Sequence, residues 1–198
     1  LANVVLAGGL LSALGSPAQS ARWLAPMIAG EAKLALAYAE LGARYDLAHC
    51  TARATQRSGQ YVLNGRKSLV LGGQCADAFV VIARTDGADT DRAGLGAFIV
   101  PANAPGLRRK SYALHDGTRA ADLELDGVTV AADDLMGDAG HAHAALEQVV
   151  DQAIAALASE AVGAMTMLVD TTLEYLKTRH QFGRPIGSNQ ALQHRMVD

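Results

Sequence analysis

The sequence lacks the features that would place it in several common classes of protein. It has only two cysteines, Cys50 and Cys75, among 198 residues, and their spacing matches no metal site and suggests no disulfide framework. A reduced, cytoplasmic setting is therefore the expected location. The net charge of −3 is small, so it gives no general attraction to nucleic acid or to anionic membranes.

Long uninterrupted apolar runs are also missing. The apolar start at residues 4–11 lacks a basic leader and contains two glycines, so it does not fit a signal peptide. No segment holds the roughly 20 uninterrupted apolar residues that cross a bilayer, so we expect no membrane span. The chain starts at Leu1 rather than at methionine, and Asp198 falls within an apparent helix. We therefore expect an internal fragment of a longer polypeptide.

Several well-known active-site motifs are absent. The sequence has no phosphate-loop lysine motif, no complete dinucleotide-binding glycine fingerprint and no Gly-x-Ser-x-Gly elbow. His141 and His143 stand two residues apart near a helix start, which is poor geometry for a metal ion. We interpret them as solvated loop histidines and predict no metal site.

The composition supports a globular protein with a sizeable core, since half of the residues are hydrophobic and 19% are charged. The first of three zones, residues 1–35, is rich in Ala and Leu. Ser16 followed by Pro17 is typical of a helix start, and this helix is predicted to run to about Ile28 and to stop at Gly30.

Residues 36–137 form a second zone, with turn signals about every ten residues that favour an antiparallel barrel or sandwich. Asn64-Gly65 separates two apolar runs and predicts a hairpin. Three further segments predict strands, the last of them turning at Asp126-Gly127: residues 78–84, 96–100 and 122–130. Residues 85–94 are rich in Asp and Gly and predict a mobile surface loop.

The third zone, residues 138–198, has helical periodicity. Apolar residues at spacings of three and four predict one helix, or two nearly continuous helices, approaching 40 residues in length. So long an apolar stripe usually packs in a helical bundle or a subunit interface. The helix breaks at residues 183–185, and a second helix is predicted to start near Asn189. The whole chain is therefore α+β.

The helix break carries side chains suited to a flat, phosphorylated ligand. Arg179 can offer a bidentate guanidinium to a pyrophosphate, and Phe182 can pack on a ring system. Gly183 lets the chain turn before Pro185. Gln190 and, three residues later, Gln193 share one side of the next helix. The residues alone also fit an ordinary helix-loop-helix with a capping arginine.

A family resemblance adds to this interpretation. Residues 175–198, with the run Arg-His-Gln-Phe-Gly-Arg-Pro-Ile at 179–186, resemble the flavin-binding motif of the acyl-CoA dehydrogenase family. Four upstream segments resemble the same family in the same order: residues 59–67, 76–85, 101–107 and 135–140. The resemblance implies the end of an N-terminal helical domain at 1–35, a β-barrel middle domain at 36–137 and the first helices of a C-terminal domain at 138–198.

The resemblance also implies a cofactor and an assembly. FAD would lie extended between barrel and C-terminal helices, with Arg179 and Phe182 reaching its phosphate–adenosine portion across a subunit contact. A homo-oligomer, dimer or tetramer, is therefore expected. The flavin ring would lie against the segment 36–45 and the strand 69–71, where backbone groups can bind it. The implied cofactor-binding residues are Tyr38, Ala39, Leu69, Val70, Leu71, Arg179, His180, Gln181, Phe182, Asn189 and Gln190.

The sequence departs from the family pattern where it would face the flavin and the substrate. Ala39 replaces a flavin-facing Thr, and Leu69 and Leu71 replace a Trp and a Thr that pack on the flavin. Tyr45 stands where a Ser commonly contacts acyl-CoA. These changes weaken side-chain hydrogen bonding but keep a hydrophobic wall, which fits a divergent branch acting on bulky or unusual acyl groups.

A second group of positions concerns the CoA portion of a substrate. Asp151 aligns with an acidic position near bound CoA, although a solvated helix charge fits it equally well. The family's Arg three residues later is Ile154 here. Glu160 is interpreted as a structural or interface acid.

The implied reaction is the α,β-dehydrogenation of an acyl-CoA thioester, as in fatty-acid β-oxidation, with electron-transferring flavoprotein as the usual acceptor. A carboxylate base removes the α proton as hydride leaves the β carbon for the flavin. In most members that base lies C-terminal of the Gln-x-x-Gln-His helix, beyond Asp198, so we assign no catalytic residue in this chain and expect it to be inactive alone. The alternatives are a non-catalytic partner subunit of a hetero-oligomer and an oxygen-using flavin enzyme of the same fold.

Overall fold

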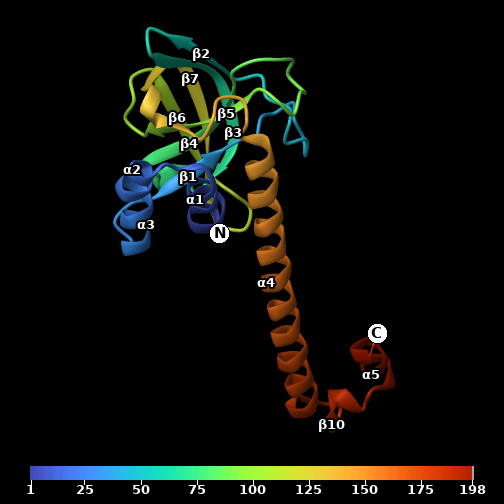
Figure 1. The fold of residues 1–198 in the computed structure, drawn as a ribbon. Helices are drawn as coiled ribbons and strands as arrows, with labels where there is room; N and C mark the ends of the chain where they lie inside the picture. Colours follow the sequence, from blue (N-terminus) through green and yellow to red (C-terminus); the bar gives the residue numbers. More distant parts are fainter. Residues whose placement is uncertain (198) are drawn as a thin grey trace. The chain divides into compact units, whose positions relative to one another are not determined.

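The computed structural model describes residues 1–197, which form two compact units, Leu1–Ala153 and a second that begins at Ile154 (Figure 1). This division falls within a long helix and does not test the predicted domain boundaries near residues 35 and 137. The first unit begins with short helical segments: η1 Ala2–Gly8, α1 Gly9–Leu14, α2 Pro17–Gln19, η2 Ser20–Leu24 and α3 Ala25–Ala29.

The predicted helix start at Ser16 is confirmed. The Ser16 hydroxyl accepts a hydrogen bond from the Gln19 amide at 3.2 Å, and the Gln19 side chain accepts one from the Ser16 amide at 2.8 Å. Together they satisfy two donors that the first helical turn leaves free. Gly30 ends this helical stretch in the left-handed conformation, with φ of 78°, as predicted.

Eight strands of the first unit form one mixed sheet, most of it antiparallel, with the order β6-β7-β3-β2-β4-β5-β8 and with β1 parallel to β4. The α+β class is therefore confirmed. The core lies on β4 and β5, where nearly every side chain is buried. The strands are β1 Leu34–Ala37, β2 Arg53–Arg57, β3 Gln60–Leu71, β4 Ala78–Arg84, β5 Leu95–Pro101, β6 Leu107–Ala113, β7 Arg119–Ala131 and β8 Leu135–Met136, with short 3₁₀ turns η3 Gly73–Cys75 and η4 Ala132–Asp134.

The two predicted turns at Asn64-Gly65 and Asp126-Gly127 are wrong. Each lies inside a continuous strand, β3 or β7, and the two face one another at a break in the strand register. The Asn64 side chain accepts a hydrogen bond from the Gly127 amide at 2.8 Å, so the pair forms an irregularity in the ladder and not a reversal. The hairpin turn is one element earlier, at Ser58-Gly59, where both residues have positive φ.

Residues 85–94, predicted to be mobile, are held by a buried arginine. The Arg84 guanidinium is fully buried at the end of β4 and donates to the carbonyls of Asp86, Asp89, Asp91 and Ala93. The same side chain reaches back to the carbonyls of Ala48 and Cys50, which fixes the preceding connection as well. The contacts that hold this loop are made by its backbone carbonyls and not by apolar side chains.

The long helix α4 spans His143–Thr178, 36 residues, and confirms the predicted helix approaching 40 residues. By length and composition alone it could cross a membrane, with a mean hydropathy of 1.5 in its most apolar stretch. The same is true of core helices in soluble proteins, so a single helix of this kind is weak evidence, and the absence of a membrane span stays a prediction.

The second unit continues past α4 with short elements. They are β9 His180–Gln181, β10 Arg184–Pro185, η5 Ile186–Ser188 and α5 Gln190–Val197. The predicted helix break and the restart near Asn189 are both confirmed.

Candidate functional site

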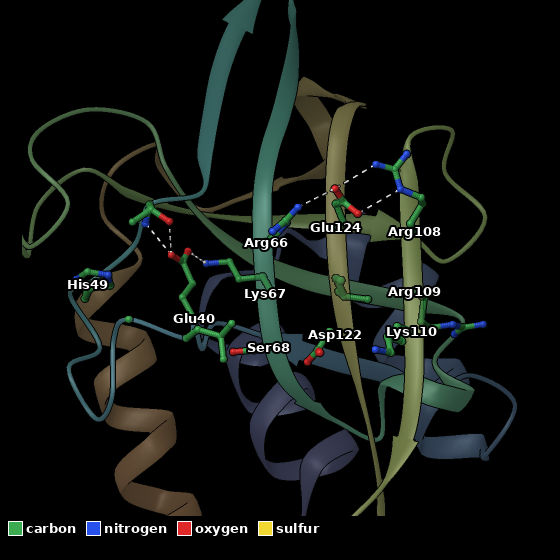
Figure 2. A pocket seen from close by; sticks show the side chains of 14 residues that line it. Glu40, His49, Arg66, Lys67, Ser68, Arg108, Arg109, Lys110, Asp122 and Glu124 are labelled. Carbon is green, nitrogen blue, oxygen red and sulfur yellow. Dashed lines mark hydrogen bonds and ion pairs between the residues drawn. The ribbon is translucent and has the colours of Figure 1, made fainter.

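A cleft of about 740 Å³ opens on the sheet of the first unit (Figure 2). Its floor is formed by residues 66–68 of β3, 122–124 of β7 and 108–110 of β6, which pair side by side in the sheet. Its other side is formed by the segment 40–42 after β1, together with His49 and Thr51. Five cationic and three acidic side chains line the cleft, so its net charge is positive and suits an anionic ligand.

The cleft is built around a buried ion pair between Lys67 of β3 and Glu40 (Figure 2). The Lys67 ammonium lies 2.7 Å from Glu40 Oε1, and the two residues are only 1% and 8% exposed. Glu40 also accepts hydrogen bonds from the Thr51 hydroxyl and amide and from the Ala52 amide. The carboxylate is thus fully partnered, which a buried charge requires.

The environment of Glu40 keeps its carboxyl ionised. Burial alone raises the pKa, but the Lys67 charge and the hydrogen bonds from Lys67 and Thr51 outweigh it. Together they lower the pKa of the Glu40 carboxyl from 4.5 to about 2. This carboxylate is therefore a structural anion at neutral pH and not a proton acceptor of ordinary basicity.

Cys50 lies in the same cluster. Its thiol is fully buried, 3.4 Å from the Lys67 ammonium, and it faces the carbonyls of Ala52 and Ile82. Burial raises the pKa of the Cys50 thiol more than the Lys67 charge lowers it. The thiol stays neutral and packs as a small apolar group.

The acidic side chains on the floor of the cleft are also engaged. Glu124 lies between Arg66 and Arg108, at 3.4 and 3.1 Å (Figure 2). The hydrogen bonds and charge of Arg108, with those of Arg66, lower the pKa of the Glu124 carboxyl. Asp122 accepts a hydrogen bond from the Tyr112 hydroxyl at 2.8 Å. None of the three acidic side chains lining this cleft is a free carboxylate positioned as a general base.

Asp122 also fixes an unusual piece of backbone. Leu69 lies at a break in the pairing of β3 with β7 and has a φ of 52°, a conformation that costs a residue with a Cβ about 1–2 kcal/mol. Its amide donates to Asp122 Oδ1 and to the Tyr112 hydroxyl, both at 3.2 Å. We call residues 67–70 the Leu69 bulge. It leaves the Leu69 side chain 50% exposed.

The structure brings the predicted ring-facing residues of the first unit to two neighbouring segments. Tyr38 and Ala39 directly follow β1 and are half-buried, and the Ser68 amide donates to the Ala39 carbonyl at 2.9 Å. Leu69 and Leu71 are at least partly exposed, whereas the Val70 side chain is buried in the core. Only the backbone of Val70 therefore remains for the predicted contact.

The predicted substrate-contacting residues are both exposed. Tyr45 is 99% exposed in a turn beside Arg44, which has a positive φ of 52°. Asp151 is exposed on α4, in a part of the helix that belongs to the first unit. Neither side chain lines the cleft. Their assignment to a substrate stays a prediction.

In the second unit, residues 179–186 form a tight β-hairpin. β9 and β10 pair antiparallel, with Gln181 opposite Arg184, so the loop consists of Phe182 and Gly183 alone. Both loop residues have positive φ, 54° and 78°, as a type I′ turn requires. Phe182 is 98% exposed at its tip. A bulky residue held in this conformation and left in solvent is typical of a contact surface.

The remaining predicted residues of this motif surround the hairpin. Arg179 and His180 are exposed, and the Arg179 carbonyl accepts from the Ile186 amide at 2.8 Å, which closes the loop. Asn189 accepts from Arg184 at 2.8 Å, and Gln190 begins α5. An apolar cleft of about 550 Å³ lies nearby, between the end of α4 and α5.

Sequence reasoning missed four residues of the first-unit site: Glu40, Lys67, Tyr112 and Asp122. A signal was available for Lys67, because the alternation of β3 places it on the buried face, between Leu63 and Val70. A lysine at an inward position indicates a buried anionic partner. No comparable signal existed for Asp122, whose partners come from two other strands.

Comparison with known proteins identifies the chain. The acyl-CoA dehydrogenase middle-domain model matches residues 35–128, and the C-terminal-domain model of the same family matches residues 143–198. The chain belongs to the acyl-CoA dehydrogenase family. Members of this family are FAD-binding flavoproteins, so the predicted cofactor and the resemblance are confirmed at the level of the family.

Individual relatives agree with this family. Mitochondrial isovaleryl-CoA dehydrogenase of Oryza sativa is 32% identical and is matched over 93% of this chain and 46% of its own length. The caffeyl-CoA reductase-Etf complex subunit CarC of Acetobacterium woodii is 30% identical, over 98% of this chain and 52% of its own. Butyryl-CoA dehydrogenase of Megasphaera elsdenii has a structure with a TM-score of 0.91 at 27% identity, over 100% of this chain and 52% of its own. The chain spans about half the length of the relatives it matches.

The residues of this acyl-CoA dehydrogenase family chain fit one wall of a flavin site. The Leu69 bulge presents an exposed apolar side chain beside the backbone of Tyr38 and Ala39, which suits the face and edge of a flat heteroaromatic ring. Backbone groups can bind that edge whatever the side chain at position 39. The loss of polar side chains at Leu69 and Leu71 therefore does not exclude the cofactor.

Proposed function

We propose that the complete protein is an FAD-dependent acyl-CoA dehydrogenase that forms an α,β double bond in an acyl thioester. The observation that carries the proposal is the Leu69 bulge, an apolar and strained surface beside the backbone of Tyr38 and Ala39 within a chain of this family. FAD, when bound, supplies the acceptor for the hydride that leaves the β carbon.

The residues of this chain would bind and orient the reactants. Backbone groups of Tyr38 and Ala39 would hold the ring edge, and Leu69 would exclude water from its face. Arg179 and the exposed Phe182 would bind the phosphate–adenosine portion of an FAD held by a neighbouring subunit, with His180, Gln181, Asn189 and Gln190 around them. Because the acidic side chains of the cleft are already paired, the base that removes the α proton is proposed to lie outside this chain.

Partners follow from the same proposal. Acyl-CoA is the substrate class, and electron-transferring flavoprotein is the proposed acceptor; CarC, named as a subunit of a complex with Etf, supports this choice. The exposed apolar face of α4 supports a homo-oligomer, dimer or tetramer. We further propose a cytoplasmic location.

Spectroscopy of the complete protein tests this function. We expect a yellow protein whose visible flavin absorbance is lost when a matching acyl-CoA is added without oxygen. A panel of straight-chain, branched and bulky thioesters identifies the acyl group. A protein that binds FAD but is bleached by no acyl-CoA would contradict the substrate part of the proposal. Rapid reoxidation of reduced flavin by oxygen would instead indicate an oxygen-using enzyme of the same fold.

A second candidate is a non-catalytic subunit of a hetero-oligomeric acyl-CoA dehydrogenase. It is favoured by Ala39, Leu69 and Leu71, which leave the ring-facing wall without the polar and aromatic side chains common in the family. A complete protein that is colourless alone and takes up FAD only with a second chain would support this candidate. A yellow, active homo-oligomer would exclude it.

A further inference from the structure

Two consecutive residues of β3, Lys67 and Ser68, hold the two segments of the proposed flavin wall together. The Lys67 ammonium donates to the Tyr38 carbonyl at 3.3 Å, and the Ser68 amide donates to the Ala39 carbonyl at 2.9 Å. The Leu69 amide turns to the opposite side, toward Asp122. The backbone of 38–39 and the Leu69 bulge are thus set against one another by direct hydrogen bonds.

Glu40 extends this connection to a third segment. Its two carboxylate oxygens accept from the Thr51 hydroxyl at 2.5 Å, the Thr51 amide at 2.9 Å and the Ala52 amide at 3.1 Å. Lys67 binds the same carboxylate at 2.7 Å. One buried ion pair therefore joins the residues after β1, the connection into β2 and the bulge of β3.

Stability alone does not explain such a pair. Removing two charges from water costs free energy that their attraction and hydrogen bonds only partly return, and apolar replacements of buried pairs are often neutral or stabilising. An apolar pair would lack a directional hydrogen bond. Packed methyl and methylene groups would not fix the position of the Tyr38 carbonyl, as the Lys67 ammonium does. The ion pair therefore fixes the position of the Tyr38 and Ala39 backbone relative to the Leu69 bulge.

We propose that Lys67 and Glu40 are positioning residues that hold the backbone of Tyr38 and Ala39 against the Leu69 bulge and thereby set the affinity of the protein for the flavin. This inference rests on the proposed function, since it concerns the same wall. Neither side chain needs to touch the flavin. Both act through the backbone that they orient.

Flavin affinity of the apoprotein, measured on the complete protein, tests the proposal. The decisive variant is the double substitution K67M/E40Q, which removes both charges and leaves neither one unpaired. The carboxamide oxygen that E40Q introduces would still accept from the Thr51 amide and hydroxyl, whereas the Ala52 amide would lose its acceptor. The matched control is R53Q, which breaks an exposed ion pair to Asp89 at the residue that directly follows Ala52 and does not line the cleft. FAD binding is followed by quenching of flavin fluorescence, and thermal unfolding of each apoprotein is measured separately.

We expect the double variant to unfold within a few degrees of the wild type but to bind FAD about tenfold more weakly or worse. The R53Q variant should match the wild type in both measurements. The Cys50 thiol provides a second readout, because loosening the cluster should speed its reaction with a disulfide reagent under native conditions. A folded double variant with wild-type FAD affinity would overturn the inference, and so would a double variant that cannot fold, since the pair would then be a requirement of the fold.

The same measurements distinguish a failure of the proposed function from a failure of the positioning role. If the wild-type protein itself binds no FAD, alone or with a partner chain, the function is wrong and the variants are not needed to show it. If the wild type binds FAD and only the predicted difference is missing, the positioning role is wrong and the function stands.

Discussion

At the scale of single residues, Glu40 is the group whose ionisation should be visible in the stability of the protein. Its pKa in the folded protein is about 2, below the ordinary value of 4.5. A depressed folded pKa contributes stability that is fully present above pH 4.5 and is lost as the pH falls toward 2. Protonation would also leave the buried Lys67 ammonium without its anion.

We therefore predict that the free energy of unfolding falls by up to about 3 kcal/mol between pH 5 and pH 2 through this residue. Denaturant titrations at several pH values measure the effect. The E40Q variant is less stable at neutral pH but should show a flatter dependence across the same window. An equally steep dependence in E40Q would assign the acid sensitivity to other carboxyl groups.

Arg84 shows how a single side chain can reverse an expectation drawn from composition. Residues 85–94 have the Asp and Gly content of a flexible loop, yet the buried guanidinium binds four of their carbonyls. Sequence patterns are read from side chains, whereas the contacts that Arg84 makes with this loop are to backbone carbonyls. These contacts were therefore not predictable from the residues that form the loop.

At the scale of elements, the sequence predicts well wherever periodicity decides the structure. The helix from Ser16 follows from its capping residues, the long α4 from its apolar spacing, and β4 and β5 from their continuous apolar runs. Turn chemistry was a poorer guide. Asn64-Gly65 and Asp126-Gly127 have the residues of tight turns, but they lie opposite one another in the sheet, where the Asn64 side chain accepts from the Gly127 amide. This contact depends on the pairing of two strands that are distant in the sequence, so neither dipeptide alone predicts it.

The two glycines of this facing pair should differ sharply on substitution. A Cβ at Gly65 would lie 2.6 Å from the Cα and Cβ of Ala52, at a φ of 141°. A Cβ at Gly127 would meet nothing within 4 Å, although φ is 65° there. Both variants lose the glycine's freedom at positive φ, and only one adds a clash with the connection that leads into β2.

We predict that G127A lowers the free energy of unfolding by about 1–2 kcal/mol, and that G65A lowers it by roughly 1–3 kcal/mol more. Urea denaturation of the two variants measures the difference directly. Equal losses would mean that the backbone around Ala52 relaxes freely. In that case Gly65 would matter only for its conformation and not for the close approach of β2.

At the scale of the whole molecule, the second unit leaves much of α4 uncovered. Its exposed apolar residues include Met165, Leu168 and Val169, while Ser159 and Thr166 lie on a polar side of the same helix. An apolar face of this length is unusual on a soluble surface and is typical of a helical bundle or a subunit interface. The C-terminal-domain match of the family covers this whole region.

The oligomeric state of the complete protein tests that account. We predict that L168E lowers the assembly to a smaller species, because a buried charge replaces a leucine whose burial contributes about 1.5–3 kcal/mol in each copy. S159E adds the same charge half a turn around the helix, on the polar side, and should leave the assembly intact. Light scattering coupled to size exclusion gives both masses. If L168E keeps the wild-type mass and stays folded, residues within its own chain cover this face, and the subunit contact must lie elsewhere.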